Sequence, residues 1–255
     1  MEQRVFQFRP HLAIQYQMQA PKYDCRHLLI VMSGFNLPDP TIYDFSMLAH
    51  CRSAILWIKD DVDGLPAYYL CRDMSFEFEE GVSTLIEAVR NSVKPTHVSI
   101  LGASKGGTAS LYFGIKHKIK NIITAVPQFS IGRYVATGYW QDVGKAMMGN
   151  VNEENQYFLD NYLPYALDQD RCLERNIYLF TSPQDKQFKT EVEPNLHLLE
   201  KYSGFNLIET FSPYVTEHTR VTAYNLNLIL ALIYQFEDGI APAWGHIRNG
   251  SQWSQ

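Results

Sequence analysis

The sequence lacks the features that mark membrane proteins and nucleic-acid binders. No window in the 255 residues approaches the roughly 18 to 20 apolar residues of a membrane helix, and the first ten residues lack the apolar core of a signal peptide. No run of Lys and Arg occurs, and the formal charge is −5 at pH 7. Because nucleic-acid binders neutralise phosphates with clustered basic side chains, these absences predict a cytoplasmic protein that binds no nucleic acid.

Cysteine is scarce, and its spacing matches neither a disulfide framework nor a metal site. The four cysteines lie far apart, and none forms a Cys-x-x-Cys pair. No His or Cys pair stands at metal-ligand spacing either. Reduced, buried thiols and no bound metal are therefore expected. The cysteines are Cys25, Cys51, Cys71 and Cys172.

What the sequence does contain is a regular alternation of strands and helices. With 46% hydrophobic residues, the chain can bury a sizeable core, and its apolar runs are nearly continuous, as in strands covered on both faces. Helical patterns of ten or more residues separate them, which favours a mostly parallel sheet flanked by helices in one α/β domain over 1–255. The strands are predicted at 27–32, 54–58, 97–101, 121–126, 176–181 and 206–211, and the helices at 76–92, 106–118, 189–202 and 219–236.

Four segments depart from this alternation. Residues 5–8 and 12–17 alternate apolar and polar side chains, which predicts an antiparallel hairpin at the sheet edge. Residues 66–72 are predicted to form a short strand, and 241–255 a loosely held tail.

The long interval 128–175 predicts a small helical cap, because insertions of this length in compact domains are often lids or binding elements. Its aromatic side chains are candidates for stacking against a substrate. The candidates are Tyr139, Trp140 and Tyr162.

One motif indicates serine chemistry. Residues 99–108 place Gly-x-Ser-x-Gly, centred on Ser104, between a predicted strand and a predicted helix. This is the context of a nucleophile elbow, where glycines at positions 102 and 106 avoid collisions in a sharp turn and the serine stands above the sheet. The same letters fit neither a phosphate-binding P-loop nor a dinucleotide-binding glycine motif.

The other members of a catalytic triad follow Ser104 in the order typical of this fold class. Asp185 comes after the strand at 176–181, and His218 follows the last predicted strand, so both lie where catalytic groups gather in open α/β sheets. We expect Asp185 to orient His218, and His218 to accept the Ser104 proton. The rivals are Glu217 and Asp170 for the acid, and His197 and His246 for the base.

An oxyanion hole needs two converging backbone N–H groups. Lys105, directly after the nucleophile, is the first candidate donor, and the loop at 33–36 supplies the second, with Phe35 favoured over Gly34. The Lys105 side chain opposes the dipole of the predicted helix. Its ammonium is expected either to meet an anionic donor or acceptor, or to point into solvent away from the site.

The residues 101–107, the Val126-Pro127-Gln128 sequence and the early Ser33-Gly34-Phe35 loop together resemble one branch of the α/β-hydrolase superfamily. The chain is similar to the bacterial capsular-polysaccharide O-acetyltransferases of the meningococcal type, and more distantly to glycan-modifying proteins of accessory secretion systems. The resemblance spans most of the chain, but the residues around Asp185 and His218 match loosely.

The resemblance implies an α/β-hydrolase fold and an O-acetyltransferase that moves acetyl from acetyl-CoA to a glycan through an acetyl-serine. It implies acetyl-CoA as donor with no resident cofactor, a polysaccharide or oligosaccharide acceptor, and further copies or capsule-assembly proteins as partners. By position, Ser104 resembles the nucleophile, Asp185 the acid and His218 the base. Two alternatives stay open: an esterase or deacetylase of the same fold, and a noncatalytic component of a glycan or secretion assembly.

Overall fold

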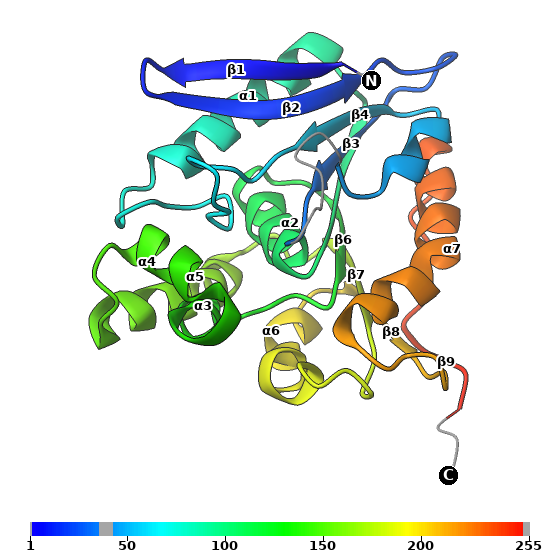
Figure 1. Cartoon of the computed structure of the whole chain (residues 1–255). Helices are drawn as coiled ribbons and strands as arrows, with labels where there is room; N and C mark the ends of the chain where they lie inside the picture. The colour runs from blue at the N-terminus through cyan, green and yellow to red at the C-terminus, as the bar shows by residue number, and fades with distance from the viewer. Residues whose placement is uncertain (1, 36–42, 252–255) are drawn as a thin grey trace.

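The computed structural model describes residues 2–35 and 43–251, and one twisted sheet runs through them (Figure 1). In these residues the sheet has nine strands in the order β1-β2-β4-β3-β5-β6-β7-β8-β9. All neighbours from β4 to β9 are parallel, whereas β1 and β2 form an antiparallel hairpin that joins the sheet along β4. The predicted edge hairpin and parallel sheet are both confirmed.

Apart from β9, which was not predicted, the strands lie close to their predicted positions, because their apolar runs are bounded by turn-forming residues. Their bounds are β1 Gln3–Arg9, β2 Leu12–Gln19, β3 His27–Met32, β4 Ala54–Ile58, β5 His97–Ala103, β6 Asn121–Ala125, β7 Asn176–Thr181, β8 Gly204–Thr210 and β9 His246–Asn249.

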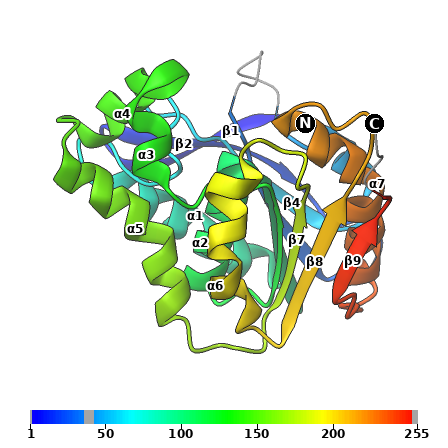
Figure 2. The same cartoon turned by 90° about the horizontal axis from the view of Figure 1, so that it is seen from below.

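Helices cover both faces of the sheet, and the inner strands are buried between them. In β3 every residue is buried: Leu28, Ile30 and Met32 point into one core, while Leu29 and Val31 point into the other. The first core includes α1 Glu77–Val93, α2 Lys105–Lys116 and α6 Leu196–Glu200, and the second includes the 3-10 turn Ser46–His50 and α7 His218–Glu237. Figure 2 shows α1, α2 and α6 on one side of the sheet and α7 on the other.

The predicted insertion between β6 and β7 is helical. It contains α3 Ile131–Ala136, the 3-10 turn Gly138–Trp140, α4 Gln141–Met148 and α5 Glu153–Gln169. Close backbone contacts hold it together, since a Cβ at Gly132 would lie 2.3 Å from the Gln156 carbonyl oxygen. Its α5 buries Leu159, Leu163 and Leu167 in the core that contains α2. This contact fixes the insertion beside the carboxyl end of the sheet.

Residues 66–72 do not form the predicted strand. The Asp60 carboxylate accepts hydrogen bonds from the N–H groups of Ala67 and Tyr69, and Tyr68 and Tyr69 adopt φ values of 54° and 60°. This left-handed backbone is incompatible with a strand. The apolar run predicted a strand because its side chains are buried, but a buried carboxylate determines its backbone.

Two other segments differ from prediction. The helix predicted at 189–202 is a π-helical turn at Phe188–Val192, a 3-10 turn at Glu193–Asn195 and the short α6, because Pro194 has no N–H to continue a regular helix. The predicted tail instead pairs as β9 with β8, anchored where Asn206 Oδ1 accepts the N–H groups of Trp244 and Gly245.

The cysteines fit the prediction of buried thiols only in part. Cys51 and Cys71 are buried, but Cys25 is half-buried and Cys172 is exposed. In 2–35 and 43–251, no helix combines the length and apolar character needed to cross a membrane.

Candidate active site

Ser104 occupies a strained turn between β5 and α2. Its backbone lies at φ 54° and ψ −124°, and its N–H donates to the Ala125 carbonyl at 2.8 Å. A Cβ at Gly102 would lie 1.9 Å from the Gly106 carbonyl oxygen, and one at Gly106 would lie 2.2 Å from the Met32 carbonyl oxygen. The flanking residues therefore have to be glycine, as a nucleophile elbow requires.

The structure brings the three predicted catalytic residues together in a hydrogen-bonded chain. The distance from Ser104 Oγ to His218 Nε2 is 3.0 Å, and from His218 Nδ1 to Asp185 Oδ2 it is 2.7 Å. The partners assign the tautomer: a protonated Nδ1 donates to the carboxylate, which leaves Nε2 to accept the serine proton. The arrangement can deprotonate Ser104 for attack on an acyl carbon.

The loop after β7 and the start of α7 position Asp185 and His218 next to Ser104. Asp185 follows β7 and is buried, and its Oδ1 accepts the Gln187 N–H at 3.0 Å while Oδ2 faces the histidine. His218 is the first residue of α7, so its ring is carried by a rigid helix end next to the elbow.

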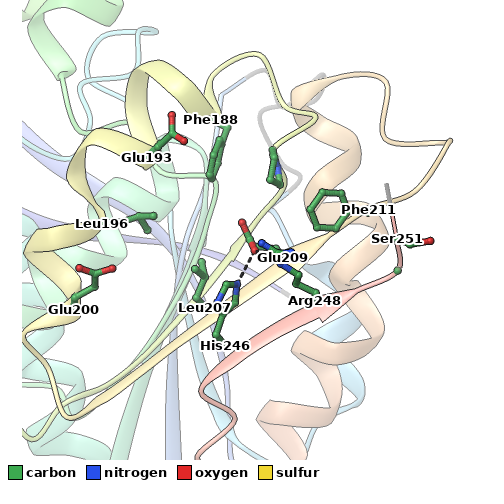
Figure 3. Close-up of a pocket in the computed structure, with 12 residues that line it drawn as sticks. Phe188, Glu193, Leu196, Glu200, Leu207, Glu209, Phe211, His246, Arg248 and Ser251 are labelled. Carbon is green, nitrogen blue, oxygen red and sulfur yellow. Dashed lines mark hydrogen bonds and ion pairs between the residues drawn. The ribbon is translucent and has the colours of Figure 1, made fainter. Parts of the chain in front are cut away.

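The rival residues are engaged elsewhere. Asp170 forms an ion pair with the buried Arg175, Glu217 pairs with Arg220 at the surface, and His197 bonds to the Pro194 carbonyl. Figure 3 shows His246 on β9, where it contacts Glu209 in a pocket at the sheet edge. None of the four takes part in the hydrogen-bonded chain at Ser104.

The two candidate donors in the early loop differ in their availability for an oxyanion. The Gly34 N–H donates to Asp44 Oδ2 at 2.6 Å, so it is already used. The Phe35 N–H therefore stays as the proposed second donor. The first donor is the Lys105 N–H, which lies in the first turn of α2, where helical N–H groups have no intrahelical partner. Asn36, in the same loop, lies outside the described residues.

The Lys105 side chain is neither a ligand for a substrate anion nor solvated, so both expectations for it were wrong. Its Nζ is buried, 2.6 Å from Asp60 Oδ2 and 2.8 Å from the Ser33 carbonyl oxygen. Burial lowers the pKa of Lys105, and the Asp60 carboxylate opposes that shift. The sequence places a lysine at a helix start, and an internal carboxylate offsets the unfavourable helix dipole.

A cavity of about 780 Å³ opens above Ser104 and His218. One wall comes from α7, and the other from the insertion, where Tyr134, Tyr139 and Trp140 line it. Trp140 stacks on Phe35 with ring centroids 4.0 Å apart, and Tyr139 lies edge-on to Trp140 and is 82% exposed. Two of the three predicted stacking residues thus face the space where a substrate would bind.

Several solved structures resemble this arrangement. The chain is similar to the capsule O-acetyltransferase of Neisseria meningitidis serogroup A, with 16% identity, a TM-score of 0.67, and coverage of 87% of this chain and 91% of that one. It is similar to the glycosylation-associated Gap123 complex of Streptococcus agalactiae (16%, 0.70, 95% and 47%) and to Est1E of Butyrivibrio proteoclasticus (13%, 0.63, 93% and 98%). The chain has the α/β-hydrolase fold.

The predicted fold and resemblance are thereby confirmed. No family model matches the sequence, and no curated protein matches it either. At these identities the similarity establishes the α/β-hydrolase fold alone, so the reaction has to be argued from the site.

Tyr162 does not line this cavity, so the prediction that it stacks on a substrate there is wrong. It stacks on Phe76 with ring centroids 5.1 Å apart, and its hydroxyl lies 3.1 Å from that of Tyr112. It lines a separate groove on α5 and is absent from the walls above Ser104. Its position on the inner side of α5 makes it a packing residue of the insertion.

Sequence reasoning missed a role for Gln128 at this hydrolase-fold site. Its Nε2 lies 2.8 Å from Ser104 Oγ and 3.0 Å from Gln187 Oε1, and the residue is fully buried. The chain reaches this position after Val126, whose φ of 41° is rare for a β-branched residue. The Pro127-Gln128 pair was noted only as a landmark, although its place after the strand next to the elbow was a usable signal.

Metal chemistry has no visible ligand set here. In the described residues, no group of three or more His, Cys, Asp or Glu side chains could hold an ion. The side chains gathered at Ser104 have the types and the hydrogen bonds that a serine nucleophile with a base and an acid requires.

Proposed function

We propose that this protein is a serine-dependent O-acetyltransferase that moves acetyl from acetyl-CoA to a hydroxyl of a capsular or related polysaccharide. The observation that carries the proposal is the hydrogen-bonded chain Ser104–His218–Asp185, built on an elbow and open to a cavity with an aromatic wall. A retired site in a noncatalytic assembly protein has no physical need to keep this geometry.

In the proposed reaction, His218 Nε2 removes the Ser104 proton as Oγ attacks the thioester carbonyl. The N–H groups of Lys105 and Phe35 stabilise the oxyanion, and His218 gives its proton to the departing CoA sulfur as the acetyl-serine forms. His218 then takes the proton of a sugar hydroxyl as that oxygen attacks the acetyl-serine, and it returns this proton to Ser104 Oγ when the acetylated sugar leaves. Asp185 stabilises the imidazolium in both halves.

Two findings support a glycan acceptor and a CoA donor. The rings of Tyr139 and Trp140 line the cavity, and the apolar face of a pyranose can stack on such rings. Among the similar structures, the meningococcal enzyme acts as a capsule O-acetyltransferase, and a variant of it has been solved with CoA. A cytoplasmic location and association with assembly proteins belong to the same proposal.

Hydrolysis of esters is the second candidate function. The similar Est1E has been solved with ferulic acid, and the open cavity here also admits water to an acyl-serine. Both candidates share the acylation of Ser104 and differ only in the acceptor.

The test is CoA release from acetyl-CoA, measured with and without capsule oligosaccharides, for wild type and for Ser104→Ala. The proposal predicts release that depends on Ser104 and rises at least tenfold with an accepted oligosaccharide, because a bound sugar hydroxyl next to the acetyl-serine attacks it faster than water does. Ser104-dependent release that ignores every oligosaccharide would assign the protein as a hydrolase. Release that is unchanged in Ser104→Ala would contradict both candidates.

A further inference from the structure

One peptide group in the loop after β3 is held on both sides by charged side chains. The Ser33 carbonyl accepts a hydrogen bond from Lys105 Nζ at 2.8 Å, and the Gly34 N–H donates to Asp44 Oδ2 at 2.6 Å. Both atoms belong to the same planar peptide unit. The unit therefore cannot rotate without breaking a charge-assisted hydrogen bond. The next peptide N–H along the chain belongs to Phe35, the proposed oxyanion donor.

The preceding peptide group is held as well. The Ser33 N–H donates to the Tyr69 hydroxyl at 2.5 Å, and that hydroxyl donates to the Ile58 carbonyl at 2.9 Å. Tyr69 is fully buried, and its ring lies 4.5 Å from Lys105 Nζ. The loop thus leaves β3 in one defined direction.

Asp60 joins these contacts into one network. Its Oδ2 accepts from Lys105 Nζ at 2.6 Å, and its Oδ1 accepts the N–H groups of Ala67 and Tyr69, both at 3.0 Å. The side chains of Lys105 and Asp60 are each 1% exposed. Burying an ion pair costs desolvation free energy that apolar side chains of similar size would avoid. A contribution to stability therefore does not explain why the pair is present.

We infer that Lys105, with Asp60 and Tyr69, is a positioning residue that fixes the direction of the Phe35 N–H relative to the Lys105 N–H. Lys105 links the two halves of the oxyanion hole: its backbone supplies one donor, and its side chain orients the peptide next to the other. The inference rests on the proposed serine acylation and adds a specific role for the lysine that follows the nucleophile.

Two variants loosen the network, and each has a matched control elsewhere in the chain. Tyr69→Phe removes one buried hydroxyl and Lys105→Met one buried cation. Tyr178→Phe also removes a buried hydroxyl, which bonds to the Pro242 carbonyl at 2.6 Å, and Arg175→Met removes the buried cation paired with Asp170. The controls lose comparable interactions outside the residues that line the cavity.

The first readout compares an aryl acetate with the corresponding aryl thionoacetate. Sulfur accepts hydrogen bonds poorly, so a correctly aimed oxyanion hole favours the oxygen ester, and a purely structural loss does not alter the rate ratio. For Tyr69→Phe we expect kcat on the oxygen ester to fall about 10-fold with KM nearly unchanged, less than the roughly 100-fold or greater loss when a donor itself is removed. The ratio of oxygen ester to thionoester should fall by a similar factor, and more in Lys105→Met.

The second readout needs no catalysis. Amide hydrogen exchange of the resting protein should speed up at Gly34 and Phe35 in Tyr69→Phe, and stay at the wild-type rate in Tyr178→Phe and Arg175→Met. Tyr69→Phe keeps the aromatic ring and the Lys105–Asp60 ion pair. Its effect therefore reports the loss of the hydroxyl contacts even if Lys105→Met fails to fold.

The outcomes separate the two proposals. Wild-type oxygen-to-thiono ratios in both variants, or unchanged exchange at Gly34 and Phe35, would overturn the positioning role. A wild type that uses aryl acetates through Ser104 but ignores acetyl-CoA and glycans would contradict the proposed function and leave this test readable.

Discussion

The reactivity of Ser104 depends on a few contacts that can be changed one atom at a time. Asp185 Oδ2 accepts the His218 Nδ1 proton at 2.7 Å and so holds the tautomer in which Nε2 can accept from serine. In Asp185→Asn an amide would face Nδ1 and favour the opposite tautomer. We expect kcat to fall by about 10⁴-fold, as in other triads, with an unchanged thermal melt.

The comparison for this prediction is Glu217→Gln, which alters the surface acid beside His218 and should leave kcat near the wild-type value. Steady-state kinetics on an aryl acetate give both numbers. A loss of less than 10-fold in Asp185→Asn would show that another acid orients the histidine.

The Gln128 amide donates to Ser104 Oγ at 2.8 Å, and we expect this hydrogen bond to stabilise negative charge that develops on Oγ as its proton leaves. Gln128→Leu keeps the size of the side chain and removes the donor. A hydrogen bond to a charged group is worth about 1.5 to 3 kcal/mol, so kcat should fall about 10- to 100-fold. Gln187→Leu removes the second contact of the same amide, and with it a 3.4 Å hydrogen bond to the Tyr134 hydroxyl, but leaves the donor to Ser104 in place and should cost less. Equal losses in the two variants would argue that Gln128 acts through packing.

At this scale the sequence predicted the residues whose types and order define the chemistry. That the structure joins Ser104, Asp185 and His218 by hydrogen bonds could be predicted because each follows a recognisable strand. The roles of Gln128 and Lys105 could not, because they depend on which side chains the sheet brings together: Asp60 is 45 positions from Lys105 in sequence. Long-range pairing of this kind leaves no local pattern.

At the scale of elements, the 3-10 turn Gly138–Trp140 carries the aromatic wall of the cavity. Trp140 stacks on Phe35 and lines the space above Ser104. Trp140→Ala should raise KM for an accepted oligosaccharide about 10-fold or more, since stacked aromatic contacts contribute about 1 kcal/mol beyond the area they bury.

The same measurement on Tyr162→Ala provides the control, because Tyr162 packs the insertion against Phe76 at the start of α1 and does not line the cavity. Its KM should stay within about twofold of wild type even if the melting temperature drops. An equal rise of KM in both variants would show that the aromatic effect reaches the acceptor through folding of the insertion.

The sequence predicted elements where apolar periodicity and turn residues agreed, as in β3, β4 and β7. It failed where one polar contact determines the backbone. Asp60 folds 66–72 into turns, and Asn206 anchors the polar segment that becomes β9. Neither contact follows from the hydrophobic pattern. The pattern therefore predicts a strand at 66–72, where the structure has buried turns, and a tail where the structure has the edge strand β9.

The stability of the whole molecule should depend on pH through a buried histidine in the centre of the sheet. His27, on β3, is fully buried, and its ring nitrogens lie 2.8 Å from Ser53 Oγ and 2.9 Å from Ser99 Oγ. Burial, and secondly the nearby His97, lower the pKa of His27 to about 3. Since the unfolded histidine titrates near 6.5, the unfolded state binds more protons between these values.

The contribution of His27 is therefore complete above pH 6.5 and is lost as the pH falls towards 3, by about 1.4 kcal/mol per pH unit. Urea unfolding at pH 7.0, 5.5 and 4.5 should show a smaller loss in His27→Gln than in wild type. The surface variant His197→Gln should keep the wild-type slope. Parallel curves for wild type and His27→Gln would show that the ring is protonated inside the fold.

The central claim is that the protein takes an acetyl group from acetyl-CoA onto Ser104 and passes it to a glycan. The intact mass of the protein after incubation with acetyl-CoA tests this claim most directly. The account predicts one added acetyl group on wild type, none on Ser104→Ala, and faster loss of the group with an accepted oligosaccharide than with buffer. A quench within the first turnover captures the adduct before the acetyl-serine is discharged. Acetyl-CoA that stays unconsumed with no adduct on wild type, or an acetyl group that also appears on Ser104→Ala, would contradict it.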